Sequence, residues 1–281
     1  MSKQQITLIL AFAAFASWGI CAHAAESGPS NTVGFWKLDV GRGYTQSSFP
    51  LLPTNKSVDN VLGDQLTGGN DPQDSDQILR WNPATGQFEM CWYNESTGAW
   101  EGDFNLLSES SAYWIYVQPD HPVTQTLVTY GNVVEMPVYN MGAMTPGYNA
   151  VGSVWAIPAA IAGSGLTGFQ GGMYLFQSDL IMNYDAATGS YSYAWKDGNG
   201  NWQGNLTQFE PLQGYWIYIA PGHPGFNWPS YPQPLQLGDG NVGPRNYNPL
   251  YSRSANLGSV PPAPPAQGMS RNNPPKIGGE N

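Results

Sequence analysis

The sequence predicts an all-β protein made of two homologous β-rich units, each a small sandwich or barrel, packed together and followed by a disordered tail. Three observations predict this class. The chain is 13% aromatic with 34 glycines and 24 prolines, which favours short strands and tight turns over long helices. A stretch of roughly a hundred residues occurs twice. From about Gly238 the chain is poor in apolar residues and cannot bury enough surface to order itself.

The repeat is the strongest of these signals. Residues 75–122 align with residues 178–224 with one deletion in a turn, and Trp92 falls on Trp195, 103 positions later. A repeat of this length indicates a duplicated small domain, because solenoid units are shorter. The predicted divisions are a signal peptide (1–24), a first unit (25–135), a second unit (136–237) and the Pro/Asn-rich tail (238–281).

Each unit is expected to consist of strands joined by turns. The segments QILRWNP and QFEMCWY flank the turn NPATG, in which Gly86 supplies a positive φ. The phrases YWIYV and YWIYI are apolar on both faces, so we expect AYWIYV to be a central strand covered on both sides. One helix is expected within residues 54–66, with Ser57 as N-cap and Gly63 near its end.

The tryptophans divide into three groups. Those repeated within strands are expected to fill the two cores, namely Trp81, Trp92, Trp114 and their counterparts. Those without a matching tryptophan are candidates for the interface between the units, namely Trp36, Trp155 and Trp228. Trp100 and Trp202 follow turns and precede a polar residue and a glycine. We predict that these two reach the surface and bind a ligand by stacking on a sugar ring, with packing against the turn as the alternative.

Three motifs carry a resemblance to known proteins. The opening motif is carried by Gly43, Tyr44 and Pro50, the middle one by Trp81 to Thr85, and the last by Glu210, Pro211 and Gly214 to Tyr218. Together they resemble modules found in many secreted and surface-exposed bacterial proteins, mostly of unassigned function. The first unit departs from the pattern by reading SESSAYWIY. The resemblance covers both units and implies a secreted or surface module without implying any chemistry.

The N-terminus carries the pattern of an export signal. Lys3 precedes an apolar run over residues 6–18, and an A-x-A cleavage site ends at Ala24. We expect cleavage there, with lipid attachment to Cys21 as the alternative. The mature protein would then lie in the periplasm, on the cell surface or outside the cell. No second long apolar stretch follows, which predicts no membrane span.

Charge and cysteine content narrow the choice of partners. Residues 25–240 hold nineteen Asp or Glu against five Lys or Arg, a balance of −14, whereas residues 241–281 have a balance of +3. An acidic body repels phosphates, so we predict no binding to nucleic acid. Cys91 is the only cysteine after cleavage and aligns with Ala194. This position indicates a small buried side chain and no internal disulfide.

The sequence shows no catalytic set. His121 and His223 occupy equivalent positions just after a strand with no carboxylate or cysteine cluster beside them in the sequence, so we expect both to stabilise the strand exit. Residues 197–201, DGNGN, have the oxygen spacing of a calcium loop, but the glycine and glutamate that should follow are missing. That pattern favours a hairpin turn. We predict no metal and no cofactor.

These observations favour an exported, non-enzymatic module that binds or scaffolds at the cell surface or outside the cell. Its expected partner is a polysaccharide or an envelope protein. One alternative is a secreted carbohydrate-active hydrolase using carboxylates such as Glu101, Asp103 or Glu210, although the first two align with Gln203 and Asn205. The other alternative is a self-assembling surface or filament subunit, which would require self-association.

Overall fold

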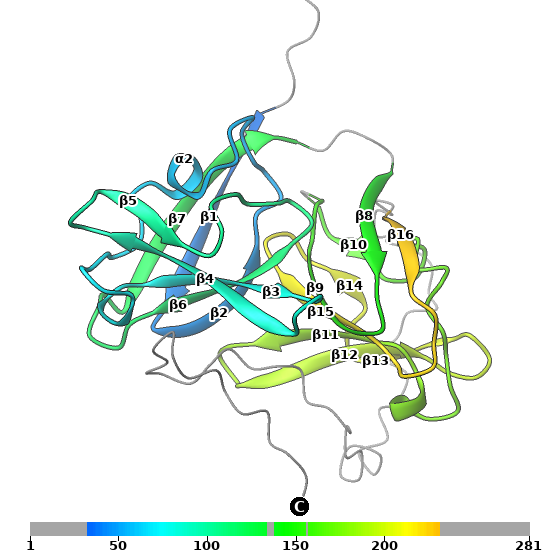
Figure 1. Cartoon of the computed structure of the whole chain (residues 1–281). Helices are drawn as coiled ribbons and strands as arrows, with labels where there is room; N and C mark the ends of the chain where they lie inside the picture. Colours follow the sequence, from blue (N-terminus) through cyan, green and yellow to red (C-terminus); the bar gives the residue numbers. More distant parts are fainter. Residues whose placement is uncertain (1–32, 134–137, 156, 231–281) are drawn as a thin grey trace, which may run out of the picture. The chain divides into compact units, whose positions relative to one another are not determined.

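The computed structural model describes residues 33–133, 138–155 and 157–230. The predicted signal peptide (1–24), the predicted tail (238–281) and the predicted boundary between the units at 135 and 136 lie outside these residues. Within the described ranges the chain is mostly β, with one short α-helix and two similar antiparallel sets of strands, β1–β7 and β8–β16 (Figure 1). The predicted fold class is confirmed.

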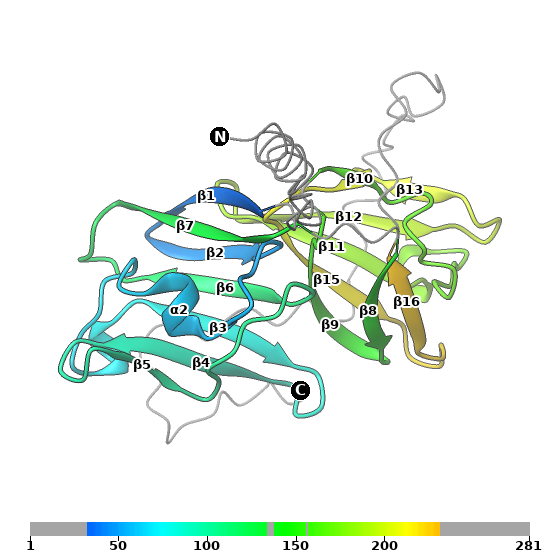
Figure 2. The same ribbon diagram turned by 90° about the horizontal axis from the view of Figure 1, so that it is seen from above.

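The first repeat contains a five-stranded sheet of order β2-β6-β3-β4-β5 and a separate ribbon in which β1 pairs with β7 along its whole length (Figure 2). Its elements are β1 (Val33–Gly41), β2 (Gly43–Ser48), α2 (Val58–Leu62), η1 (Pro72–Asp74), β3 (Gln77–Asn82), β4 (Gln87–Asn94), β5 (Ala99–Gly102), β6 (Ala112–Val117) and β7 (Thr124–Asn132).

The second repeat has the same strand order, β9-β15-β11-β12-β13, and an equivalent ribbon of β8 and β16. A further pair joins β10 to β14. Its elements are β8 (Tyr139–Met144), β9 (Gly147–Gly152), β10 (Ala159–Ala160), η2 (Leu175–Gln177), β11 (Leu180–Asp185), β12 (Ser190–Lys196), β13 (Trp202–Gly204), β14 (Gln208–Phe209), β15 (Gly214–Ile219) and β16 (Phe226–Ser230).

The registers of the two sheets agree residue by residue. Trp92 pairs with Gln77 across β3 and β4, and Trp195 pairs with Leu180 across β11 and β12. Gln77 and Leu180 are 103 positions apart, as are Trp92 and Trp195, in agreement with the sequence alignment. Strands β6 and β15 each have a neighbour on both sides. The predicted central position of AYWIYV is therefore confirmed.

The helix α2 forms where the sequence predicts it. Ser57 is extended and its side chain accepts a hydrogen bond from the backbone N–H of Asn60 at 3.2 Å, which satisfies one of the free donors of the first turn. Gly63 ends the helix with φ of +52°. The buried side chains of Val58, Val61 and Leu62 face the core of the first repeat.

Each five-stranded sheet is buried on both faces. Along β6, Tyr113 and Ile115 point into the core of the first repeat, whereas Trp114 and Tyr116 point to the opposite face. That opposite face meets its counterpart from the second repeat in one apolar cluster. The fully buried members of this shared cluster are Leu79, Trp114, Tyr116, Leu180, Met182 and Trp216.

The shared cluster, which we call the inter-repeat layer, is built from crossed aromatic pairs. The ring of Trp216 lies 5.6 Å from that of Trp81, nearly perpendicular to it, and the indole N–H of Trp81 donates to the carbonyl of Tyr148 at 2.9 Å. The equivalent contact, between Trp114 and Tyr184, has ring centroids 5.2 Å apart. Edge-to-face and tilted pairs of this kind stabilise beyond the apolar area that they bury.

The predicted distribution of tryptophans is wrong in two respects. Trp155 and Trp228, candidates for the interface, lie in the core of the second repeat. Trp81, Trp114 and Trp216, expected in the separate cores, form the inter-repeat layer. The reason is that a strand apolar on both faces contributes one face to its own core and the other to the neighbouring sheet, and strand alternation alone does not assign the faces.

Two backbone hydrogen bonds link the repeats in a symmetric way. The N–H of Ser48 donates to the carbonyl of Leu212 at 3.0 Å, and the N–H of Gly152, which aligns with Ser48, donates to the carbonyl of Ser110 at 2.9 Å. A Cβ on Gly152 would lie 2.6 Å from the Cβ of Ser48. One on Gly214 would lie 2.9 Å from the Cβ of Ala112. Glycine at these two positions therefore allows the sheets to approach.

We predict a loss of stability at alkaline pH that originates in the inter-repeat layer. Burial, followed by the neighbouring phenol of Tyr116, raises the pKa of Tyr44 to about 12, and burial raises the pKa of Tyr191 to about 12. Unfolded tyrosine ionises near pH 10. The unfolded chain therefore releases these protons first, so stability is intact below pH 10 and falls as the pH rises from 10 through 12.

The measurement is the urea midpoint as a function of pH between 8 and about 12, compared with that of a Tyr44→Phe/Tyr191→Phe double variant. The double variant should lose less stability above pH 10 because it lacks two of the buried hydroxyls. Identical slopes for both proteins above pH 10 would contradict the assignment.

Candidate functional site

The two predicted ligand-binding tryptophans are half-buried and in contact with their own repeats. The indole N–H of Trp100 donates to the carbonyl of Gly63 at 2.7 Å, and its ring packs against the first core. Trp202 lies 5.2 Å from the ring of Phe169, with the ammonium of Lys196 5.1 Å from its own ring centroid. These contacts hold both indoles in packing positions. Their stacking on a sugar stays a prediction.

The predicted hairpin turn at residues 197–201 is present. The carboxylate of Asp197 accepts hydrogen bonds from the backbone N–H groups of Asn199 and Asn201, both at 2.9 Å. Hydrogen bonding to Asn201, Asn199 and Gln203 lowers the pKa of Asp197 and outweighs its slight desolvation. The carboxylate of Asp197 therefore stabilises the turn through these hydrogen bonds.

Each repeat contains a buried aspartate that holds a histidine. In the first repeat the Asp76 side chain is fully buried and its Oδ1 lies 2.7 Å from Nδ1 of His121. The same oxygen accepts from the N–H of Gln118, and Oδ2 accepts from the N–H of Thr67 and the amide of Gln125. The carboxylate joins the start of β3 to the exit of β6.

The second repeat has the same arrangement. Asp179 is also fully buried, and its Oδ1 lies 2.7 Å from Nδ1 of His223 and accepts from the N–H of Ala220 at 2.9 Å. Oδ2 accepts from the N–H of Gln170 at 2.7 Å. The position of the histidines at the strand exits agrees with their expected role. The carboxylate partners come from about 45 residues earlier in the chain, so sequence neighbours did not reveal them.

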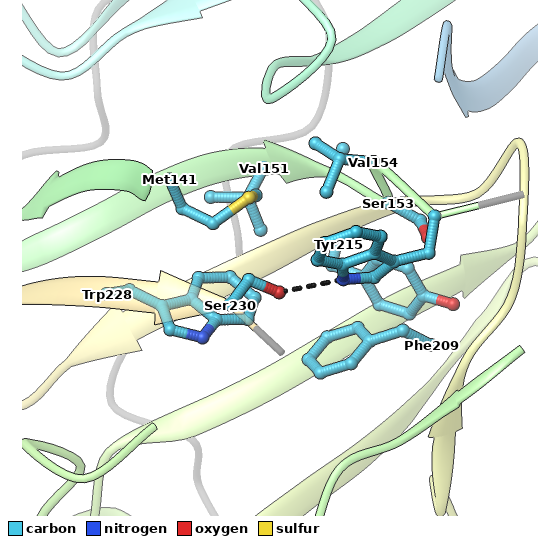
Figure 3. A pocket seen from close by; sticks show the side chains of 10 residues that line it. Met141, Val151, Ser153, Val154, Phe209, Tyr215, Trp228 and Ser230 are labelled. Carbon is cyan, nitrogen blue, oxygen red and sulfur yellow. Dashed lines mark hydrogen bonds between the residues drawn. The ribbon is translucent and has the colours of Figure 1, made fainter. Parts of the chain in front are cut away.

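The core of the second repeat contains a small cavity beside Ser153 and Trp228 (Figure 3). In the same view the indole N–H of Trp155 donates to the hydroxyl of Ser230 at 3.0 Å. The volume is about 10 Å³, which is close to the minimum for a single water molecule. This cavity is too small for any larger ligand.

A larger, open groove lies where the first repeat meets the second. Its volume is about 390 Å³, within the range typical of small-molecule sites. The polar side chains that line it come from β2 (Thr45, Gln46), from β11 (Asn183, Asp185) and from the segment before β15 (Glu210, Gln213). We call it the junction groove. Sequence reasoning missed it because it depends on contacts between residues more than a hundred positions apart.

Gln46 is the unusual residue of the junction groove. Its side chain is only 3% exposed, and its Oε1 accepts from the N–H of Tyr184 at 3.3 Å. Because the N–H of Tyr184 donates this bond, the oxygen of the Gln46 amide must face it. Nε2 must therefore point away from that N–H. Nε2 is buried and has no acceptor among the described residues. A buried donor without a partner costs about 1–3 kcal/mol.

The backbone beside the groove is strained as well. Leu212 has φ of +63°, the only positive value for a residue other than glycine in the described chain. Its carbonyl accepts from the N–H of Ser48 at 3.0 Å and from the hydroxyl of Ser47 at 2.7 Å. These bonds from the first repeat fix the segment between Glu210 and Gln213 in a conformation that a leucine rarely adopts.

The groove is acidic. Asp185 is exposed at its rim, where a hydrogen bond from the Thr188 hydroxyl, followed by one from the N–H of Ala187, lowers the pKa of the carboxyl. Glu210 is half-buried and accepts a hydrogen bond from the side-chain amide of Gln208. The lining residues include no lysine or arginine. The potential inside the groove is therefore negative.

The polar set of the groove occurs once, although its scaffold occurs twice. In the alignment Gln46 corresponds to Ala150, Asp185 to Asn82 and Glu210 to Ser108. The equivalent positions thus lack the unpaired amide and both carboxylates. The duplicated frame builds the same turns and strands in both places, and these three substitutions are among those that distinguish the groove from its counterpart.

No family model matches the chain, and no curated protein or solved structure matches it. In the described ranges no helix is long and apolar enough to cross a membrane. No three His, Cys, Asp or Glu side chains gather there as a metal site would require.

We predict that Asp76→Asn lowers the free energy of unfolding by about 1–3 kcal/mol. The asparagine has one acceptor oxygen, so its NH2 group would face a backbone N–H that the carboxylate now satisfies. Urea denaturation measures the change, and Asp74→Asn, in the same loop but exposed, is the matched control. An Asp76→Asn protein as stable as the control would contradict a structural role for the buried pair.

Proposed function

We propose that this protein is an exported, non-enzymatic binding module that acts at the cell surface or outside the cell and holds its ligand in the junction groove. The observation that carries the proposal is the buried, unpaired Nε2 of Gln46, a residue that lines the same groove as Asp185 and Glu210. A buried polar group without a hydrogen-bond partner lowers the stability of the fold. A ligand that supplies the missing partner accounts for such a group.

The chemistry of the groove supports binding rather than catalysis. A general acid needs a raised pKa at neutral pH, whereas the pKa of Asp185 is lowered. Two carboxylates of the alternative hydrolase are held in their own hairpin: Glu101 accepts from the side chain of Asn94 at 2.9 Å, and Asp103 from the N–H of Met90 at 3.0 Å. The third, Glu210, lines the junction groove.

The cysteine is unsuited to covalent catalysis. Cys91 is 0% exposed, and burial raises the pKa of its thiol well above the usual value. A nucleophilic cysteine requires the opposite, an accessible thiol with a lowered pKa. The small side chain of Cys91 packs in the first core, as expected from its alignment with Ala194.

The proposed location rests on the sequence. The N-terminal pattern ending at Ala24 is typical of an export signal. The resemblance to modules of secreted and surface-exposed bacterial proteins points the same way. The expected partners are therefore envelope polymers, either polysaccharide or protein.

The experiment is a titration of the mature chain, residues 25–281, labelled with ¹⁵N. Soluble polysaccharide and protein fractions from the envelope of the producing cells are added separately. We expect the side-chain amide resonances of Gln46 to move with one fraction, because Nε2 gains an acceptor. The indole resonances of Trp100 and Trp202 report the alternative site in the same spectra.

Gln46→Ala is the control, since the second repeat already carries alanine at the equivalent Ala150. This variant should fold and bind the active fraction more weakly, as followed by the backbone amide resonances of the groove. The proposal fails if no fraction moves the Gln46 resonance. It also fails if only the indole resonances of Trp100 and Trp202 respond, or if the protein releases new reducing ends or amines from either fraction.

A further inference from the structure

We propose that the ligand of the junction groove is a neutral saccharide; this inference rests on the proposed function. One part of the lining needs a hydrogen-bond acceptor, and another part needs a donor. Gln46 Nε2 can only donate a hydrogen bond, whereas the carboxylate oxygens of Asp185 and Glu210 are acceptors. A ligand that satisfies all three must both donate and accept hydrogen bonds. A sugar hydroxyl does both with a single atom.

Charged ligands fit the groove less well. An anionic group would accept from Gln46 but would meet Asp185 and Glu210 with no cationic side chain in the lining. An ammonium group would pair with the carboxylates but offers no acceptor, so Gln46 Nε2 would remain unpaired. Calcium takes six to eight oxygen ligands, and the groove supplies two carboxylates.

A peptide satisfies donors and acceptors too, but the lining does not suit it. Extended peptides are recognised by main-chain bonds to a sheet edge and by apolar pockets for alternate side chains. The apolar part of the lining consists of two alanines, Ala186 and Ala187, and the ring of Tyr184. That ring is already packed against Trp114 and Tyr191, each 5.2 Å away between centroids. Amide and carboxylate groups dominate the remaining surface.

The duplicated fold offers a conservative way to remove the charge of Asp185. Its Oδ1 accepts from the N–H of Ala187 at 2.9 Å, and in the equivalent turn Asn82 Oδ1 accepts from the N–H of Ala84 at 3.0 Å. Asp185→Asn should therefore keep the turn and remove only the negative charge. Asp197 makes the same local bond in a turn outside the groove, where it accepts from the N–H of Asn199 at 2.9 Å, so Asp197→Asn removes the same charge and serves as the matched control.

The test uses the mature chain with maltopentaose, cellopentaose, spermidine and pentaglycine as probes, followed by the active envelope fraction. We expect a neutral oligosaccharide to move the Gln46 amide resonances. Asp185→Asn and Gln46→Ala should each weaken its binding about tenfold, because each removes one hydrogen bond, in the first case to a charged group. Asp197→Asn should bind as the parent does.

If neither pure sugar binds, the active envelope fraction is used to test the saccharide assignment. Periodate oxidation, which cleaves vicinal diols, should abolish its effect on Gln46, protease digestion should leave it intact, and the active material should pass an anion exchanger. Activity that survives periodate, is retained as an anion, or is matched by spermidine or pentaglycine overturns the saccharide assignment while the binding function stands. If no fraction moves the Gln46 resonance, the proposed function itself fails.

Discussion

The two repeats depend on one constraint: the strands β6 and β15 are apolar on both faces, so neither sheet can leave its second face in water. Each repeat covers one face with its own ribbon and loops. The other faces cover each other, and Trp216 meets Trp81 as Trp114 meets Tyr184. Buried aromatic rings contribute more apolar area than any other side chains. The inter-repeat layer therefore belongs to the core of the folded chain.

The same packing creates the junction groove. The symmetric bonds from Ser48 to Leu212 and from Gly152 to Ser110 fix how β2 approaches the second repeat. That approach places Gln46 on the backbone of Tyr184, beside a segment whose strained Leu212 is held by the first repeat. In the proposed function, the duplication supplies a rigid frame and a few unmatched residues supply the ligand chemistry.

Much of the fold could be predicted from the sequence because the duplication repeats its local signals. The 103-residue spacing between Trp92 and Trp195 predicts the common register, and Ser57 predicts the start of the only described helix. The faces of Trp114 and Trp216 could not be assigned, because alternation within a strand shows that both sides are buried without identifying what covers each side.

The candidate site could be predicted only in part. Glu210 is one of the three carboxylates that the sequence offers for the hydrolase alternative, but Gln46 resembles any polar residue in a strand. Its burial and missing acceptor arise from a contact with Tyr184, 138 positions away. The partner of His121 was hidden for a similar reason, since Asp76 lies 45 positions earlier, at the start of a different strand. Local patterns carry no information about such contacts.

Differential scanning calorimetry of residues 25–281 tests the central claim, that the inter-repeat layer makes the two repeats one cooperative structure. The account predicts a single transition whose calorimetric enthalpy equals its van't Hoff enthalpy. Trp216→Ala should lower the temperature of that whole transition, because the substitution removes a side chain that both repeats contact. Two separate transitions in the parent protein, with Trp216→Ala shifting only one of them, would contradict the account.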